Sequence, residues 1–562
     1  MGKRTIRRRV FLLKKRDFLG CLFMDIRKKN TLYVAAVTIV LACLVIGGCG
    51  GSAKTAKPAK PEIKLDLSTT VGSLAEVFSP ESIPVEGYSI VGGLRGTGSE
   101  ECPEQIREYL EKYIKRQLPE EKDIERYISS PDTAVVHAFG FMPVTGSKGQ
   151  KFDIKVAALS GTQTTSLEGG ALLGVELFEG GKFGAALKVL SKADGTVYID
   201  KIDNPQPDKK VGYILGGATV QSEYKINLAL RQPDYKTASL IANRLNGRFG
   251  GGTARAVSPG LVELKAPAKY AKQKQRFVSI AMATYLVDSP EVTKDRIAAF
   301  IKMLAVSEEK NQGEIALEAI GKESLGKLAV LLNSSNEKVR LRAGRCMLNM
   351  GSDQGLIVLR EIAMDKNAAG RIEAMDAITL AANRNDAAAL SRLLLRDENL
   401  DVVLAAYENL RKLDDVSINQ KQVGGIFYLE QISQTSIKAV FASRSGQPRI
   451  ALFGGSLKCR DDIFVQSADG EITINSAPGQ GFVTIMRKHP TRANIPPIQL
   501  RSSFELSDII AILCESPVAK SESKVRTGLG VSYANMIAIV RLMCEKGAVN
   551  AQFRAGALPK ID

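Results

Sequence analysis

A spacing of 31 or 32 residues recurs in the middle of the chain and limits what this part can form. The small residues Ala343, Ala374 and Ala406 are equivalent, and a second equivalent set follows each of them four residues later, at Met347, Ile378 and Leu410. A helical pattern precedes each unit, at residues 325–332, 356–363 and 387–395. One helix pair cannot bury its apolar face alone, so such units stack on one another. We expect stacked helix pairs over residues 289–415.

The sequence SNEKVRLRAGRCMLNMG, residues 335–351, resembles the short class of HEAT-like repeats. Such repeats usually present a surface to another protein, so the resemblance implies a protein partner that the sequence does not identify. A plain helical bundle is the alternative, because it would contain the same amphipathic helices without a repeated stack. The regular spacing favours the stack.

Strand patterns dominate the sequence before the helical array. Apolar runs bounded by Gly, Pro, Asn or Asp predict strands at residues 134–139, 153–158, 185–190, 196–199, 225–230 and 261–264. Two helices are predicted among them, at residues 102–117 and 235–245. This part of the chain is therefore expected to be β-rich, with few long helices.

Strand patterns return after the array. Antiparallel strands are predicted at residues 449–453, 463–466, 471–475 and 481–486, followed by helices at 505–514 and 533–546 and a last strand at 549–553. The predicted fold class is α+β, in which an α-solenoid splits a β-rich framework. The expected domains are residues 71–288, 289–415 and 416–562.

The positive charge of the chain is concentrated at its start. The net charge is +17, and the first 30 residues hold eleven Lys and Arg against Asp17 and Asp25. The rest of the chain is only mildly basic and shows no basic stripe with interleaved aromatic residues, so nucleic-acid binding is not expected.

An uncharged segment, residues 31–48, follows this basic region and ends at Cys49. A basic start, an apolar run and small residues are typical of a secretory signal. Ile46-Gly47-Gly48-Cys49 resembles a bacterial lipobox, which implies a lipid on Cys49; a permanent membrane anchor is the alternative. Met24 would give a leader of ordinary length within residues 1–49. Residues 50–70, rich in Ala, Lys and Pro at their start, are expected to be a tether.

The remaining cysteines are far apart in sequence, at Cys102, Cys346, Cys459, Cys514 and Cys544. They show no C-x-x-C spacing, which argues against a zinc site or a dense disulfide framework. Buried thiols are expected, with a Cys514–Cys544 bridge as the alternative.

Residues able to carry catalysis are scarce. The chain has two histidines, His137 in an apolar strand pattern and His489 before a proline, and it lacks the G-x-S-x-G and H-E-x-x-H motifs. We therefore predict no catalytic residue, no metal site and no cofactor. An exported hydrolase acting on wall polymer remains a hypothesis without a motif.

A glycine-rich stretch invites comparison with a phosphate-binding loop, and its glycines are Gly92, Gly93, Gly96 and Gly98. A P-loop needs a lysine after its last glycine, but here Ser99 is followed by Glu100 and Glu101. The order G-x-x-G-x-G also reverses the dinucleotide fingerprint. Glycines that permit positive φ and close backbone approach explain the stretch better.

The neighbours of this stretch resemble the flagellar P-ring protein family. GYSIVGGLRGTGSEECPEQIREYL, residues 87–110, is similar to an opening segment of the family, and GGATVQSEYKINLALRQPDYKTASLIANRLN, residues 216–246, matches a later one in order. Together the blocks span residues 85–287. The motif residues outside the first glycine stretch are Ser166, Leu167, Gly169, Gly170, Gly216, Gly217, Pro233 and Asp234.

Residues 449–474 and 528–553 are similar to the family's C-terminal segments. The resemblance implies a P-ring framework that the helical array splits, with the two halves meeting near Gln447. Two features depart from the family, whose members generally carry neither a lipid nor a HEAT-like insertion.

The resemblance implies a non-enzymatic subunit that forms a periplasmic ring with copies of itself. The ring would surround the flagellar rod and adjoin the L-ring and peptidoglycan, and a lipid anchor would tether it to a membrane, the outer one being favoured. The alternative is a lipid-anchored scaffold or pore component of a non-flagellar envelope machine, with the helical repeats as its docking surface.

Overall fold

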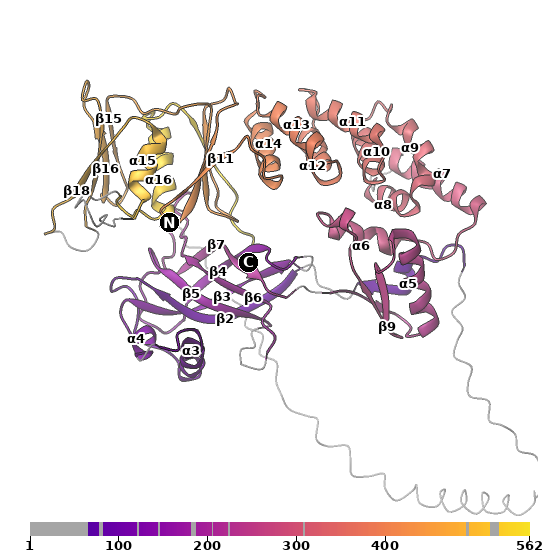
Figure 1. Ribbon diagram of the computed structural model, residues 1–562, viewed down its shortest axis with the longest axis horizontal. Coiled ribbons are helices and arrows are strands. Elements are labelled where there is room, and N and C mark those ends of the chain that lie inside the picture. The colour runs from indigo at the N-terminus through magenta and orange to yellow at the C-terminus, as the bar shows by residue number, and fades with distance from the viewer. Residues whose placement is uncertain are drawn as a thin grey trace, which may run out of the picture. The chain divides into compact units, whose positions relative to one another are not determined.

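A computed structural model describes residues 66–561, apart from 78–81, 121–122, 144–145, 181–186, 205, 223–224, 307–309, 490–493 and 517–527. The predicted leader and Cys49 lie outside the described residues. Leu65–Asp562 forms one compact unit, whose sheets and helices confirm the α+β class (Figure 1). Within the described part, no helix is both long and apolar enough to cross a membrane.

Six strands form a closed barrel in the order β2-β3-β4-β7-β6-β5. They are β2 (Ser82–Gly92), β3 (Thr133–Pro143), β4 (Lys151–Ala158), β5 (Ala171–Glu179), β6 (Ser191–Thr196) and β7 (Val211–Val220). Alternate residues point inward, so that Val85, Val136 and Ile154 lie in one apolar core. Helices α3 (Glu104–Gln117) and α4 (Glu125–Ile128) pack outside the barrel, where Leu110 and Ile114 meet Ile90 and Val135.

The predictions for residues 185–190 and 196–199 were wrong. Within the described part of this segment the structure has one strand, β6, which lies between the two predicted ones. Leu190 is buried but extends no strand. After Thr196 the chain keeps one antiparallel bridge to β7, between Tyr198 and Tyr213, while the side chain of Tyr198 packs into the C-terminal core. Residues 185 and 186 lie outside the described residues.

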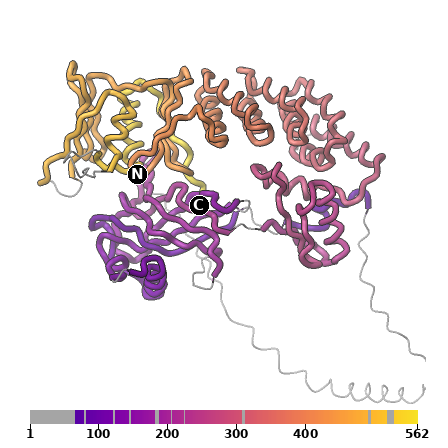
Figure 2. Tube along the Cα trace, viewed as in Figure 1, coloured from indigo at the N-terminus to yellow at the C-terminus, as the bar shows by residue number. Residues whose placement is uncertain are grey.

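A second sheet has the order β1-β8-β10-β9, from β1 (Ala75–Val77), β8 (Ile226–Leu230), β10 (Leu261–Leu264) and β9 (Ala254–Ser258). β1 precedes the barrel in the chain and β8 follows it, so the barrel is inserted into this smaller unit (Figure 2). Helices α5 (Tyr235–Phe249) and α6 (Lys274–Ala283) complete its core. Asp234 begins α5 as its N-cap and accepts a hydrogen bond from the Thr237 N–H at 2.8 Å.

Eight helices follow, from α7 to α14. They are α7 (Pro290–Val306), α8 (Lys310–Ile320), α9 (Leu325–Leu331), α10 (Glu337–Asn349), α11 (Asp353–Met364), α12 (Arg371–Ala381), α13 (Arg384–Leu394) and α14 (Leu400–Lys412). The repeated positions Ala343, Ala374 and Ala406 are fully buried and lie six or seven residues before the last residue of α10, α12 and α14. The helices predicted for residues 325–332, 356–363 and 387–395 are α9, α11 and α13.

The C-terminal part has two sheets with two helices between them (Figure 1). The five-stranded sheet contains β11 (Asn419–Val423), β12 (Phe427–Ile432), β13 (Ala439–Ala442), β14 (Arg449–Phe453) and β19 (Gln552–Ala555), and the four-stranded sheet contains β15 (Ile463–Gln466), β16 (Ile472–Ser476), β17 (Val483–Arg487) and β18 (Ile498–Ser502). The helices α15 (Leu506–Cys514) and α16 (Tyr533–Glu545) share one apolar core with both sheets.

One expectation for this part needs correction, and for the cysteines the structure decides between the two alternatives. The strand predicted at residues 449–453 exists as β14, and it was expected to pair antiparallel. It pairs antiparallel with β13 on one side but parallel with β12 on the other. The Cys514–Cys544 bridge is absent, and all five described cysteines are free thiols. Cys514 is fully buried in the core, which raises the pKa of its thiol.

Candidate functional site

Two of the sequence motifs are joined directly in space. The glycine stretch leaves β2 and turns at Leu94–Thr97, where the Thr97 N–H donates to the Leu94 carbonyl at 3.2 Å. The carbonyl of Thr97 accepts hydrogen bonds from the N–H groups of Thr165 and Ser166, and its hydroxyl donates to the Ser166 carbonyl at 2.8 Å. The turn and the Ser166 motif therefore form one end of the barrel.

A cleft of about 740 Å³ lies where this end of the barrel meets the C-terminal part. Six predicted motif residues line it, namely Gly93, Ser166, Gly169, Gly170, Gly216 and Gly217. The turn before β16, the end of β17 and the start of α16 form the opposite wall, which includes Glu471, Arg487 and Tyr533. Residues far apart in sequence thus converge on one place.

The other motif residues lie elsewhere. Leu167 is fully buried in the barrel core, and Pro233 and Asp234 precede α5 in the smaller unit. Gly92 ends β2, and Gly96 has a positive φ in the turn. Gly98 donates to the Pro131 carbonyl at 2.8 Å, and a Cβ at this position would collide with the carbonyl of Thr133.

The cleft carries charges of both signs. On the barrel wall, Lys201 pairs with Glu168 and also donates to the Asn535 side chain of α16 at 2.8 Å. On the opposite wall, burial raises the pKa of Glu471, and nearby Asp469 raises it further. Burial lowers the pKa of Arg487, whose Nε atom is buried and has no hydrogen-bond partner among the described residues. The cleft is therefore a polar junction rather than an apolar pocket.

The carboxylate of Asp153 forms hydrogen bonds with both halves of the framework. Asp153 on β4 accepts a hydrogen bond from the Gly216 N–H at 2.6 Å and another from the Gly446 N–H at 2.9 Å. Burial raises the pKa of Asp153 in spite of these two bonds, which favour its ionised form. Gly446 precedes Gln447, where the sequence had suggested that the two halves meet.

An arginine strengthens the same junction. Arg444 of the C-terminal part donates to Asp203 at 2.6 Å and to the Gly556 carbonyl at 2.6 Å. Its contact with Asp200, at 3.3 Å, extends to the hydroxyl of Tyr198, which donates to Asp200 at 2.7 Å. Tyr198 packs at the C-terminal core beside Tyr533. The barrel and the C-terminal part are thus held by hydrogen bonds and by apolar burial.

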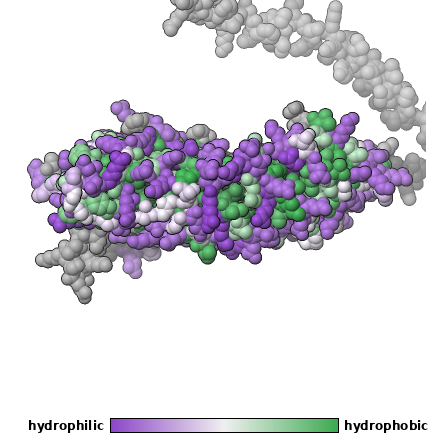
Figure 3. Space-filling view, turned by 90° about the horizontal axis from the view of Figure 1, so that it is seen from above, coloured by the Kyte–Doolittle hydropathy of each residue, from purple (hydrophilic) through white to green (hydrophobic). Residues whose placement is uncertain are grey.

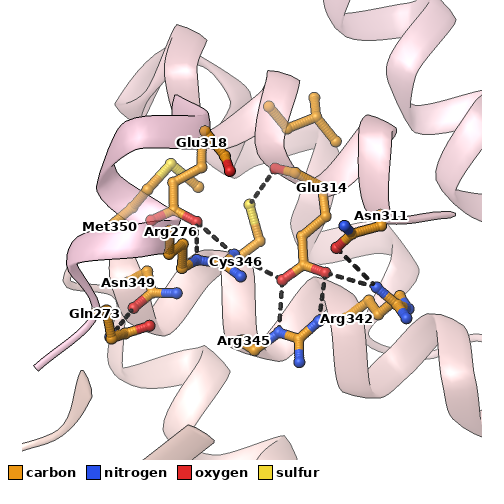
Figure 4. Close-up of polar contacts among 12 residues, drawn as sticks. Gln273, Arg276, Asn311, Glu314, Glu318, Arg342, Arg345, Cys346, Asn349 and Met350 are labelled. Carbon is orange, nitrogen blue, oxygen red and sulfur yellow. Dashed lines mark hydrogen bonds and ion pairs between the residues drawn. The ribbon is translucent and has the colours of Figure 1, made fainter. Parts of the chain in front are cut away.

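A second cluster joins the smaller β unit to the helical array (Figure 4). Arg276 on α6 contacts two fully buried carboxylates on α8, Glu314 at 2.7 Å and Glu318 at 2.5 Å. Arg345 on α10 pairs with Glu314 through two nitrogens, both at 2.6 Å, and Arg342 approaches the same carboxylate at 3.1 Å.

Burial pushes the pKa of both carboxylates upward, but their partners differ. At Glu314 the bonds from Arg345 and Arg276 outweigh burial, and the pKa is lowered. At Glu318 burial dominates over the single arginine, Arg276, and the pKa is raised. Both carboxylates are held by arginines, so the cluster is a structural joint between elements.

Neither cluster has the features of a reaction centre. In the part of the chain that the structure describes, no group of His, Cys, Asp and Glu has the arrangement of a metal site. His137 lies 3.1 Å from Glu86 on the outside of the barrel and stacks on Phe139. These contacts fit the expectation of a structural histidine.

Comparison with known proteins reveals the same family as the sequence motifs. The sequence model of the family described as flagellar P-ring protein matches residues 71–297. A flagellar P-ring protein of Anaeromyxobacter dehalogenans is 32% identical over 215 residues, which cover 35% of this chain and 54% of the relative. The flagellar P-ring protein of Thermotoga maritima is 30% identical over 245 residues, covering 41% of this chain and 68% of the relative. The chain belongs to the flagellar P-ring protein family.

This assignment confirms the resemblance and bears on the class of function. P-ring proteins are structural, non-enzymatic and periplasmic, which agrees with the expectation that this chain is not an enzyme. The alignment spans only about half the length of the Anaeromyxobacter relatives. The match of the family model ends at residue 297, so the likeness of the C-terminal segments stays a prediction.

Sequence reasoning missed the side chains that hold the junctions together. Thr97 lies inside the glycine motif, but the sequence predicted no role for it. Asp153, Glu314 and Arg444 were not predicted as site residues either. Their partners across the junctions lie between 28 and 293 residues away in the chain, so no local pattern marks them. Glu314 and Glu318 do lie one helical turn apart on an apolar helix, which is a signal of buried charge.

Proposed function

We propose that this protein is a non-enzymatic subunit of a periplasmic ring that resembles the flagellar P-ring. Membership of the P-ring family carries this proposal. The cleft and the contacts of Asp153 and Arg444 between the barrel and the C-terminal part support the proposal. A ring subunit needs rigid joints between its parts and surfaces that contact other subunits. The ring would be built from copies of this chain, related by head-to-tail contacts that close.

The finer parts of the proposal concern the partners and the location. The ring surrounds the flagellar rod, adjoins the L-ring and associates with peptidoglycan. A lipid on Cys49 tethers each subunit to a membrane, the outer one being favoured. The pattern Ile46-Gly47-Gly48-Cys49 supports the anchor, and replacing Cys49 with Ser should then release the protein from the membrane fraction.

A second candidate function keeps the fold and changes the machine. Residues beyond 297 fall outside the match of the family model, and α7 to α14 occupy most of the chain between residue 290 and β11. This array favours a lipid-anchored scaffold or pore component of a non-flagellar envelope complex, which docks a partner through its helices.

Electron microscopy of complexes extracted in detergent tests the proposal. We expect rings that surround a rod and disappear when the gene is deleted, together with loss of swimming. Rings without a rod, in a host that swims normally after the deletion, would favour the scaffold. If the extracted chain is a monomer under all conditions, the ring function fails.

A further inference from the structure

Two helices of the array expose pairs of apolar residues. Ile357 and Met364 on α11 are 57% and 45% exposed, and Ile372 and Leu380 on α12 are 38% and 37% exposed. The first pair is seven residues apart and the second pair eight, so each lies along one side of its helix. Figure 3 shows apolar side chains gathered between hydrophilic ones on the face of the array seen there.

The stripe on α11 includes two charges without a partner. Arg360 and Glu361 fall between Ile357 and Met364, three and four residues after Ile357, and therefore on the same side of the helix. Both are exposed, and neither forms an ion pair with a described residue. We name Ile357, Arg360, Glu361 and Met364 the α11 stripe.

The pair on α12 lines a groove of about 470 Å³. One wall consists of α12, with Ile372, Glu373, Asp376, Ala377 and Leu380, and the other includes Lys272 and Gln273 before α6. We name this cavity the α12 groove. Arg276 and Arg345 also line it, and both are paired with Glu314, so the groove adjoins the joint between α6, α8 and α10.

Two charged side chains of the groove, Lys272 and Asp376, have no close ionic partner among the described residues. Lys272 is exposed and pairs with no described carboxylate. Asp376 is approached by Lys412 at 3.9 Å and accepts a hydrogen bond from Asn409 at 3.0 Å, yet its side chain is still 45% exposed. The groove thus has a cation on one wall and a carboxylate on the other.

The stripe and the groove are complementary. A rise of about 1.5 Å per residue puts the apolar pair of the stripe about 10 Å apart and that of the groove about 12 Å apart. Laid antiparallel against each other, Ile357 meets Leu380 and Met364 meets Ile372, while Arg360 faces Asp376 and Glu361 faces Lys272. Opposite charges flanking an apolar contact determine its direction as well as its partner.

We infer that the α11 stripe of one copy of this chain docks into the α12 groove of a second copy. Both halves of the contact are on the same chain, and they are different surfaces, so the contact is head-to-tail and generates a ring or a filament. The inference rests on the proposed ring function and assigns part of the subunit contact to the inserted helices.

Site-directed cross-linking of the assembled full-length protein tests the contact. The double variant Ile357→Cys/Leu380→Cys, treated with a short bismaleimide, should give a ladder of covalent multimers. Each single variant should give none when the half-buried free thiols Cys102 and Cys544 are replaced with Ser in every variant. The control Val330→Cys/Leu380→Cys places one thiol on α9, where Val330 is highly exposed, and it should also give none.

Charge reversal provides the second measurement. Glu361→Lys in the cysteine pair places like charges opposite each other, and it should lower the cross-linked yield about tenfold. Adding Lys272→Glu should restore the yield, which no loss of folding would do. Rings visible by microscopy without cross-linking at the pair would overturn the inference and leave the ring function intact. Absence of any assembly would overturn both, and equal ladders from the α9 control would show random collision.

Discussion

Gly216 lies at the point where two distant parts of the chain come together. Its φ is +58°, in the left-handed region, and its N–H donates to Asp153. A Cβ at this position would lie 3.0 Å from the carbonyl carbon of Gly446, which is backbone and cannot rotate away. The position requires glycine for two independent reasons, its dihedral angle and its lack of space.

Replacing Gly216 with Ala should therefore destabilise the protein by about 2–4 kcal/mol in the free energy of unfolding. Gly161→Ala is the matched control, because Gly161 has a φ of +91° but open space around its Cβ direction. We expect about 1–2 kcal/mol there, from the backbone alone. Urea denaturation measures both, and equal losses would mean that the contact with Gly446 contributes nothing.

The sequence predicted that Gly216 belongs to a motif, but it did not predict which residues Gly216 contacts. The family resemblance marked Gly216 and Gly217 as motif residues, since a glycine motif is visible in a single chain. Asp153, which binds the N–H of Gly216, is an ordinary acidic residue in a strand pattern. Its other partner, Gly446, is 293 residues away, and only the folded chain brings them together.

At the level of elements, Asp415 secures the connection from α14 to β11. It accepts two hydrogen bonds from Arg392 of α13, at 3.0 and 2.6 Å, and two from Ser417. Burial alone would raise the pKa of Asp415, but the bonds from Arg392 and Ser417 outweigh it and lower the pKa from 3.8 to about 2.

A pKa that is lower in the folded state means that Asp415 stabilises the fold above about pH 4 and loses this contribution as the pH falls through about 2. Asp415→Asn should lower the thermal midpoint at pH 7 and have a smaller effect at pH 2. Glu398→Gln, in an exposed pair with Lys366, should change neither. Parallel pH profiles of the variant and the native chain would contradict the assignment.

We expect the ion pairs that join α6, α8 and α10 to make a large contribution to the free energy of unfolding. Glu314→Gln leaves Arg276 and Arg345 without their shared carboxylate in a buried place, so we expect a loss of about 3–5 kcal/mol in the free energy of unfolding. Glu108→Gln removes an exposed partner of Lys112 at 3.9 Å and should cost less than about 0.5 kcal/mol. Denaturation of both variants in guanidinium chloride checks the difference.

Elements differed in how well the sequence predicted them. Helices of the array follow from a local period, and α9, α11 and α13 were found within three residues at every end. Strands depend on partners elsewhere in the chain. β6 was misplaced because its limits are determined by pairing with β5 and β7. β14 was expected to pair antiparallel, but it also pairs parallel with β12, a strand that was not predicted.

At the scale of the whole chain, the array is attached at both of its ends. The carboxylates of α8 pair with Arg276 of the smaller β unit. At the far end, Tyr407 of α14 donates to the buried Glu430 of β12 at 2.5 Å and packs against Phe453 of β14. Residues of α14 and of the five-stranded sheet share one apolar core. The inserted helices therefore belong to the framework that they interrupt.

Because the array is attached at both of its ends, we expect different results from two deletions within it. Removing residues 292–413 would uncover Phe453 and the buried Glu430 and would leave Arg276 without its carboxylates, so we expect an aggregated chain. Removing one repeat, residues 353–383, joins α10 to α13 at an equivalent position and keeps both ends of the array. Because each unit contacts mainly its neighbours, the shorter stack should still fold.

Circular dichroism and size-exclusion chromatography compare the two deletions. The one-repeat deletion also removes the α11 stripe and the α12 groove, so a folded chain that no longer assembles through the array is the expected result. If it aggregates as the full deletion does, the helices are not interchangeable units. If the full deletion folds, the two ends of the array are surface contacts, and the β framework is stable without its insertion.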